Sequence, residues 1–176
     1  VRQEAAAVIA RLRDSGITCT LLLSGDRAEK AHQLARTLGM DDCVAESTPE
    51  SKVEVVRQLQ QQGRKVLFVG DGVNDAPVLA QADVGLAMNQ SAELAQQAAD
   101  AVLLQDSLQG VVLARELALE AMGLVRSNNA LTEWINSASM LAAALGGLSP
   151  ASSALLHNGT TLAVLLRALT ARKAST

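Results

Sequence analysis

The sequence has very few aromatic residues and very few cysteines, and each scarcity limits what the chain can be. Among 176 residues there is one Trp, one Phe and no Tyr, so any core must be built from Leu, Val and Ala. The two cysteines, Cys19 and Cys43, do not have metal-ligand spacing, and we expect both to be reduced and structural. The net charge of −3 gives no electrostatic reason to expect a nucleic acid as a partner.

The beginning of the sequence also lacks the features of a targeting segment. No basic stretch followed by a short apolar one is present, so we expect no signal peptide. The first residue is Val1 rather than Met, and it already lies next to a helical pattern. We therefore expect the chain to be part of a longer protein, with room here for one ordinary domain and a small addition.

Residues 65–77 are the stretch around which the rest is organised. The apolar run 65–69 is typical of a buried parallel strand, and Gly-Asp-Gly-Val-Asn-Asp-Ala-Pro follows it at once. Polar groups just past the carboxyl end of such a strand lie where open α/β sheets bind ligands. Asp71 and Asp75 are hard oxygen donors suited to a magnesium ion shared with a phosphate. Taken alone, however, a Gly-Asp-Gly run also fits an ordinary turn between a strand and a helix.

Helical and strand patterns alternate up to residue 106. Thr48 and Ser91 are expected to cap helices, and Pro49 is expected at a first helical position. The alternation predicts an α/β fold with a parallel sheet and right-handed crossovers. The predicted helices cover residues 2–15, 27–36, 49–62, 74–81 and 91–99, and the predicted strands cover residues 17–23, 42–46, 65–69, 84–88 and 101–104.

Beyond residue 106 the pattern is helical only. We expect a connecting helix at 107–126, two helices at 127–148 and 151–169 that cross a membrane, and a cytoplasmic tail at 170–176. Basic residues lie before the first apolar stretch and after the second. They favour a cytoplasmic location for the start of the first crossing and for the end of the second. Polar residues within both stretches would be costly facing lipid, so a soluble helical hairpin is the open alternative.

Two further short motifs carry groups that are able to handle phosphate. Ser24-Gly25-Asp26 follows a predicted strand, where the Ser24 hydroxyl and the amides of the next helix can hold a phosphate oxygen. Lys52, one turn into its helix in Pro49-Glu50-Ser51-Lys52, offers a positive charge to a transferring phosphoryl group. Taken alone, the first motif is better explained as a helix cap, and the second as an ordinary surface lysine.

In this order, the three motifs resemble the second, third and fourth conserved motifs of the haloacid-dehalogenase-like fold. The Gly-Asp-Gly-x-Asn-Asp-Ala-Pro run is similar to the last signature motif of the P-type ATPases, with Ser24 where that family usually has Thr. The resemblance implies an incomplete Rossmann-like parallel sheet, with residues 1–106 as the C-terminal part of a phosphorylation domain. It implies Mg²⁺ and ATP as cofactors.

The resemblance also implies roles for individual residues. Ser24 and Lys52 would contact phosphoryl oxygens, while Asp71 would ligate magnesium. Asn74 and Asp75 would orient the ion and the phosphate, with Asp75 also in the metal site. The remaining motif residues, Gly25 and Asp26, would support the phosphate loop.

One part of the family's machinery is missing from residues 1–176. Family members attack phosphate with the first aspartate of an Asp-Lys-Thr-Gly-Thr motif, which does not occur in this sequence. In P-type ATPases that aspartate lies well upstream, before a nucleotide-binding domain. We therefore expect this polypeptide alone to have no ATPase or phosphatase turnover.

The last part of the sequence resembles heavy-metal-transporting P-type ATPases, which end after two helices at this point. The cluster His157-Asn158-Gly159-Thr160-Thr161 is similar to a His-Glu-Gly-x-Thr motif of the cobalt/zinc-type subgroup, with Asn158 in place of its carboxylate. His157 and Thr161 are therefore candidate ligands of a transported metal, although a structural hydrogen bond between helices explains His157 equally well.

The expectation is thus the C-terminal part of an ATP-driven heavy-metal cation transporter in the cell membrane, with its catalytic part in the cytoplasm. Its partners would be a transition-metal cation of the Co, Zn, Ni or Cu class, the lipid bilayer and the remainder of the same transporter. Two alternatives stay open: a soluble haloacid-dehalogenase-like phosphatase, and a non-catalytic regulatory module with a helical hairpin.

Overall fold

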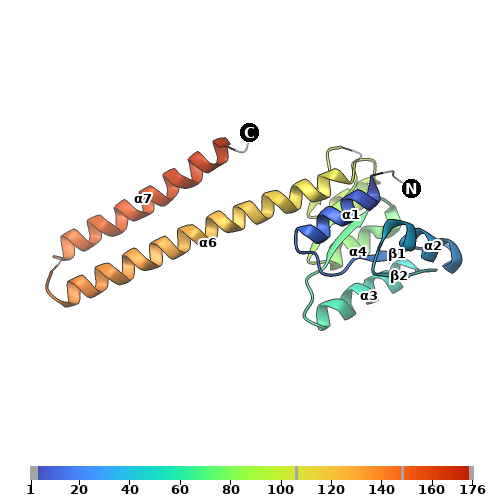
Figure 1. Cartoon of the computed structure of the whole chain (residues 1–176), viewed down its shortest axis with the longest axis horizontal. Coiled ribbons are helices and arrows are strands. Elements are labelled where there is room, and N and C mark those ends of the chain that lie inside the picture. The colour runs from blue at the N-terminus through green and yellow to red at the C-terminus, as the bar shows by residue number, and fades with distance from the viewer. Residues whose placement is uncertain (1–3, 106, 148, 175–176) are drawn as a thin grey trace. The chain divides into compact units, whose positions relative to one another are not determined.

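The computed structural model describes residues 4–105, 107–147 and 149–174 of the chain. The described residues form two compact units, one ending at Glu116 and one beginning at Leu117. Unit 1 contains all the described strands and is the unit with the three motifs (Figure 1). Unit 2 is helical.

Unit 1 alternates strands and helices, as the sequence predicts. Its strands are β1 (Leu21–Leu23), β2 (Asp42–Val44), β3 (Leu67–Gly70), β4 (Val84–Ala87) and β5 (Ala101–Val102). The helices of the two units are α1 (Ala5–Asp14), α2 (Ala28–Leu38), α3 (Pro49–Gln61), the 3₁₀ turn η1 (Val73–Asp75), α4 (Ala76–Gln81), α5 (Glu93–Ala98), α6 (Gln109–Ala144) and α7 (Pro150–Ala174). The class is therefore α/β in unit 1, followed by two long helices.

Every strand pair is parallel, which confirms the predicted pairing. β1 pairs with β2, with Leu22 opposite Cys43. β3, β4 and β5 form a second sheet, with Phe68 opposite Gly85 and Leu86 opposite Ala101. The strands thus form two sheets rather than the single sheet expected, because β1 and β3 are each paired along one edge only within the described residues.

The local signals at the start of α3 were predicted correctly. The Thr48 hydroxyl accepts a hydrogen bond from the Ser51 amide at 3.2 Å, and Pro49 occupies the first helical position of α3. Gly39 ends α2 with φ of 69°, a left-handed conformation that glycine adopts without a Cβ clash.

The predicted cap at Ser91 is wrong. The N-terminal cap residue of α5 is Ala92, which makes no side-chain cap. Ser91 is buried, and its hydroxyl donates to the Met88 carbonyl at 2.6 Å, back toward the end of β4. The hydroxyl thus makes a local bond to the turn before the helix, an alternative that Ser side chains commonly adopt in place of capping.

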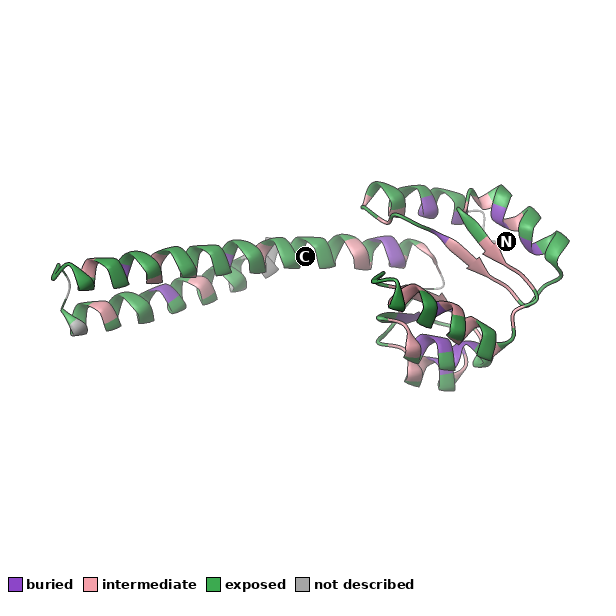
Figure 2. Ribbon diagram, turned by 90° about the horizontal axis from the view of Figure 1, so that it is seen from below, coloured by how far each residue is buried: buried purple, intermediate pink, exposed green. Residues whose placement is uncertain are grey.

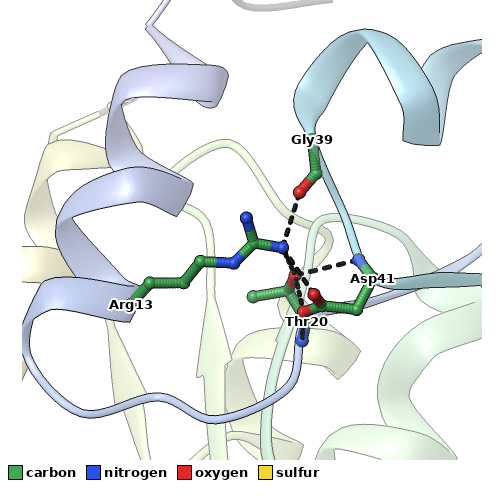
Figure 3. Close-up of polar contacts among 4 residues, drawn as sticks. All are labelled: Arg13, Thr20, Gly39 and Asp41. Atoms are coloured by element: carbon green, nitrogen blue, oxygen red, sulfur yellow. Dashed lines mark hydrogen bonds and ion pairs between the residues drawn. The ribbon is translucent and has the colours of Figure 1, made fainter.

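The first strand is shorter than predicted, because the residues ahead of it bind other partners. The Ile17 amide donates to the Leu12 carbonyl at the end of α1. Thr20 donates from both its amide and its hydroxyl to Asp41 Oδ2, at 2.7 Å each. Arg13 completes this cluster by donating to Asp41 Oδ1 at 2.7 Å and to the Gly39 carbonyl at 2.6 Å (Figure 3). These bonds tie α1 to the turn between α2 and β2.

A similar cluster fixes the beginning of β3. Asp83 accepts hydrogen bonds from Lys65 Nζ at 2.7 Å, from the Val66 amide at 3.0 Å and from Gln60 Nε2 at 3.1 Å. These donors, with Lys65 first among them, lower the pKa of Asp83 to about 2. In the first cluster, the Thr20 hydrogen bonds and then Arg13 lower the pKa of Asp41 to about 2.

The core of unit 1 packs helices against the sheet of β3, β4 and β5. One cluster joins Leu86, Met88, Leu103 and Val111, and a second joins Leu79, Ala87 and Ala95. In the second, α4 lies so close to β4 that a Cβ on Gly85 would meet the Leu79 carbonyl oxygen at 2.5 Å. Glycine is therefore required at this position of the strand.

Unit 2 has an unusual distribution of buried side chains. Its buried residues, among those described, are the polar Asn128, Ser139 and Thr160. Large apolar side chains are exposed instead, and most of both helices is coloured as exposed in Figure 2. Of the helices in the described ranges, none meets the length and hydropathy needed to cross a membrane. The two membrane crossings therefore stay a prediction.

We predict that acid unfolds unit 1 in part through Asp41 and Asp83. Because folding lowers the pKa of both from about 3.8 to about 2, their contribution to stability is present above pH ~4 and is lost as the pH falls toward 2. Thermal unfolding followed by circular dichroism between about pH 6 and pH 2 measures this loss. Asp41→Asn should make the melting temperature less dependent on pH across this window, whereas the exposed Asp14→Asn should leave the dependence unchanged. If the melting temperature changed with pH to the same extent in the wild type, Asp41→Asn and Asp14→Asn, this role of Asp41 would be contradicted.

Candidate functional site

A short ion pair joins two of the three motifs. Lys52 Nζ lies 2.7 Å from Asp75 Oδ1, and the two side chains are only 14 % and 12 % exposed. Lys52 comes from the first turn of α3, and Asp75 from the turn after β3. The sequence predicts both residues at a phosphate site, but nothing in it shows that they bind each other, since they are 23 positions apart.

The backbone around Asp75 is built for close approach. Asp75 lies in η1, where its amide donates to the Gly72 carbonyl at 3.0 Å and its Oδ2 accepts from the Gly72 amide at 3.4 Å. A Cβ on Gly70 would lie 2.9 Å from the Asp75 Cβ and 3.1 Å from Oδ2. Gly70 therefore allows the carboxylate to fold back over the end of β3, and a larger residue would displace it.

Main-chain hydrogen bonds hold the Ser24 loop (residues 24–26) against residues 44–47. The Ser24 amide donates to the Val44 carbonyl at 3.0 Å, and the Ser47 amide donates to the Ser24 carbonyl at 2.9 Å. The Glu46 amide donates to the Asp26 carbonyl at 3.0 Å, with Glu46 in a left-handed conformation (φ 53°). Because Thr48 caps α3 immediately afterwards, these bonds position the Ser24 loop against the segment that leads to Lys52.

Side chains of the Ser24 loop bind within the loop itself. The Ser24 hydroxyl accepts from the Asp26 amide at 3.1 Å, as a turn or cap residue does. Asp26 accepts from Lys30 Nζ at 3.0 Å in an exposed pair one helical turn apart. Gly25 is exposed. The hydroxyl is thus at the carboxyl end of β1, with one of its acceptor positions already used.

Asp71, in the loop between β3 and η1, and Asn74, within η1, are both exposed. Within the described residues, no hydrogen bond joins Ser24, Lys52 and Asp71 directly, so their convergence on one ligand stays a prediction. No group of three or more His, Cys, Asp or Glu side chains is placed to hold a metal in the described part of the chain. A magnesium site built from one or two carboxylates and a substrate phosphate does not need such a group.

The candidate metal ligands of unit 2 make hydrogen bonds within the hairpin. His157 Nδ1 lies 3.2 Å from Asn136 Oδ1, which joins α7 to α6. The Thr161 hydroxyl donates to the His157 carbonyl at 3.1 Å. The structure thus shows the interhelical hydrogen bond that was the alternative role for His157. Asn136 was missed as its partner, because an Asn within a helical apolar stretch gives no signal of which residue it faces.

The comparisons with known proteins agree with the fold and with the motifs. Residues 1–83 match the family model of the haloacid dehalogenase-like hydrolases. The chain is 43 % identical to the zinc-exporting P-type ATPase of Mycobacterium marinum over 94 % of its length, and 42 % identical to the manganese-exporting P-type ATPase of Mycobacterium leprae over the same share. The chain is homologous to the heavy-metal-exporting P-type ATPases.

A solved structure shows the same similarity in three dimensions. The chain superposes on a zinc-transporting PIB-type ATPase in its E2.Pi state with a TM-score of 0.89, at 32 % identity and over 97 % of the chain. It covers 28 % of that structure, and 23 % of each of the two mycobacterial relatives. The heavy-metal P-type ATPase family is therefore recognised correctly from the sequence, while the match covers only about a quarter of a family member.

We predict that the Lys52–Asp75 pair stabilises unit 1. Lys52→Ala should lower the free energy of unfolding by about 1–3 kcal/mol, because it leaves a largely buried carboxylate without its charged partner. Urea denaturation measures the change, and a double-mutant cycle with Asp75→Asn should show that the two effects are not additive.

An exposed ion pair elsewhere in α3 serves as the control for this experiment. Arg57 and Glu54 form an ion pair within α3 at 2.9 Å, with side chains 50 % and 51 % exposed. Arg57→Ala should change the stability by less than about 0.5 kcal/mol. Equal effects of the Lys52 and Arg57 substitutions would show that the Lys52–Asp75 pair is an ordinary surface pair.

Proposed function

We propose that this chain is the C-terminal part of an ATP-driven transition-metal transporter, and that it supplies the phosphate and magnesium loops and the last two membrane helices. The observation that carries the proposal is the Lys52–Asp75 ion pair, which joins the Pro-x-x-Lys motif to the Gly-Asp-Gly-x-Asn-Asp motif. The homology to zinc-exporting and manganese-exporting P-type ATPases supports the same function.

Phosphoryl transfer needs fixed positive charge and hydrogen-bond donors rather than covalent help from most of the site. In this proposal Lys52 and the Ser24 hydroxyl face the phosphoryl oxygens, and Asn74 orients the phosphate. Lys52 is held by Asp75 before any phosphate arrives, so its ammonium group is already placed. Gly25 and Asp26 complete the Ser24 loop, and the Asp26 carbonyl keeps it in position by accepting a hydrogen bond from the Glu46 amide.

The donor set after β3 fits a magnesium ion. Asp71 offers an exposed carboxylate, and Asp75 offers a second one four residues later. Asp75 Oδ2 accepts a long hydrogen bond from the Gly72 amide, at 3.4 Å. Mg²⁺ is commonly held by one or two carboxylates together with phosphate oxygens and water. When bound, it would neutralise charge on the transferring phosphoryl group of ATP or of the phosphoenzyme.

The nucleophilic aspartate would come from the remainder of the transporter. β1 ends just before Ser24 and β3 ends just before Asp71, and both strands lie at the edge of a sheet. A parallel strand inserted between these two edges would end between the two motifs. An aspartate at its carboxyl end would meet the phosphate that Ser24, Lys52 and Asp71 surround.

The side chains of unit 2 favour apolar surroundings. Trp134, Met140 and Leu155 are 77 %, 74 % and 78 % exposed, while the buried positions are polar. We propose that lipid and the other helices of the transporter cover these side chains, with unit 1 in the cytoplasm. His157 and Thr161 then lie among helices of the transport path, where a transition-metal cation would pass.

We predict that the purified chain alone hydrolyses neither ATP nor p-nitrophenyl phosphate, because it lacks the attacking carboxylate. In a full-length transporter containing this chain, Asp71→Asn should reduce metal-stimulated ATP hydrolysis by about 10²-fold or more. Glu54→Gln, on the outer face of α3, should leave it unchanged. A robust phosphatase rate from the chain itself, abolished by Asp71→Ala, would refute the proposal.

We also predict that the chain, when expressed in bacteria, stays in the membrane pellet after carbonate extraction. The exposed apolar side chains of α6 and α7 are the physical reason. Immunoblotting of the pellet and supernatant measures the distribution, with unit 1 (residues 1–116) expressed alone as the control that should be extracted. Complete release of the whole chain by carbonate would contradict the membrane location.

A further inference from the structure

Both ends of helix α1 form hydrogen bonds with the beginning of α6 and the residues just before it. Glu4, just before α1, accepts through Oε1 from the Ser107 hydroxyl at 2.9 Å and from the Leu108 amide at 2.8 Å. At the other end, Arg115 Nη2 donates to the carbonyl of Ser15 at 3.5 Å. All these residues belong to unit 1. The contacts span about 100 positions of sequence and hold two elements that do not follow each other in the chain.

Arg11 makes the most specific of these contacts. Its Nη1 donates to Gln109 Oε1 at 3.0 Å and its Nη2 donates to Glu116 Oε1 at 2.7 Å. The two acceptors are seven residues apart, so they lie on one face of α6, two turns from each other. One planar guanidinium thus spans the first two turns of the helix, which a lysine cannot do because it presents a point charge.

The first two turns of α6 (residues 109–116, here called the base of α6) pack on the strands that end at the candidate site. Val111, at 2 % exposure, lies in the cluster of Leu86 and Met88, against which Leu12 and Val69 also pack. Val69 directly precedes Gly70 and Asp71 in the sequence. A movement of the first turns of α6 would therefore reach the strand that presents the magnesium loop. The same helix continues without a break to Ala144 in unit 2.

We propose that Arg11 is a positioning residue. It fixes the first two turns of α6 (residues 109–116) to α1, so that a displacement at the phosphate site is transmitted to α6. The proposal rests on the proposed function, since it concerns the coupling of hydrolysis to metal movement. It assigns no direct contact with phosphate or metal to Arg11. Its effect comes through the position of α6.

The first experiment measures the lock itself in the 176-residue chain, without any assumption about transport. Arg11→Glu should raise hydrogen–deuterium exchange of the amides at 109–116 by about two- to fivefold, the change expected from loss of an exposed ion pair. The swap Arg11→Glu with Glu116→Arg should restore part of the protection. Arg11→Gln, which removes the charge without creating repulsion, should give a smaller increase and guards against misfolding of the first variant.

Arg57→Glu is the matched control. It reverses the charge of an arginine whose ion pair with Glu54 has the same exposed fractions, 50 % and 51 %, as the pair of Arg11 with Glu116. Arg57 contributes to α3 only, so exchange at 109–116 should not change. Unchanged exchange in Arg11→Glu, or an equal rise in Arg57→Glu, would overturn the proposal.

The second experiment measures coupling in a full-length transporter containing this chain, reconstituted in vesicles. Arg11→Glu should retain metal-stimulated ATP hydrolysis, while the metal moved per ATP hydrolysed falls by about two- to fivefold. The charge swap should raise this ratio again. A purely structural role would lower hydrolysis and transport together, leave the ratio unchanged, and so overturn the positioning role.

The two experiments separate the two ideas. A wild-type transporter without metal-stimulated hydrolysis would overturn the proposed function, and with it the coupling role of Arg11. The exchange data would still decide whether Arg11 holds the base of α6. A transporter that hydrolyses ATP, but whose Arg11→Glu variant shows raised exchange with an unchanged ratio, would overturn the coupling role alone.

Discussion

The Lys52–Asp75 ion pair is the interaction that links the two sheets of unit 1 at the candidate site. It joins the helix that follows the β1–β2 sheet to the turn that follows β3, and these two sheets share no hydrogen-bonded strands. With side chains 14 % and 12 % exposed, either charge left alone would be costly, whereas paired they hold each other. A pair of this kind adds little to stability over an apolar contact, but it fixes direction and register. This property would suit the phosphate site of the proposed function.

The pair ends a continuous path of short-range contacts between the motifs. The Ser24 loop is bonded to Glu46 and Ser47, Thr48 caps α3, Lys52 reaches Asp75, and Asp75 folds back over Gly70 and Gly72. Each step depends on a residue type that cannot easily be replaced, such as a hydroxyl at the cap or a missing Cβ at Gly70. The motifs are therefore more than a set of reactive groups, since the same residues also build the connections between the loops.

The sequence predicted what depends on neighbours in the chain and failed where distant residues decide. The Thr48 cap and Pro49 at the first position of α3 follow from local chemistry, and both were predicted. Ser91 was assigned as a cap because its type fits, yet the fold offers it the Met88 carbonyl instead. Residues 17–20 were expected to extend the first strand, but Asp41 and Leu12 compete for their hydrogen bonds. At the candidate site, the sequence names Lys52 and Asp75 separately but gives no sign of their ion pair, and the partner of His157 was missed for the same reason.

The free edges of β1 and β3 constrain the rest of the protein. Unpaired strand edges attract other strands, and natural proteins normally cover or interrupt them. Here the two edges belong to the strands whose carboxyl ends carry Ser24 and Asp71, so any strand that pairs with either edge in parallel must end beside a phosphate motif. A strand pairing with both would complete one continuous parallel sheet and bring its own last residue to the centre of the site. Under the proposed function, a single strand from the remainder of the transporter would both cover the two open edges and supply the attacking aspartate.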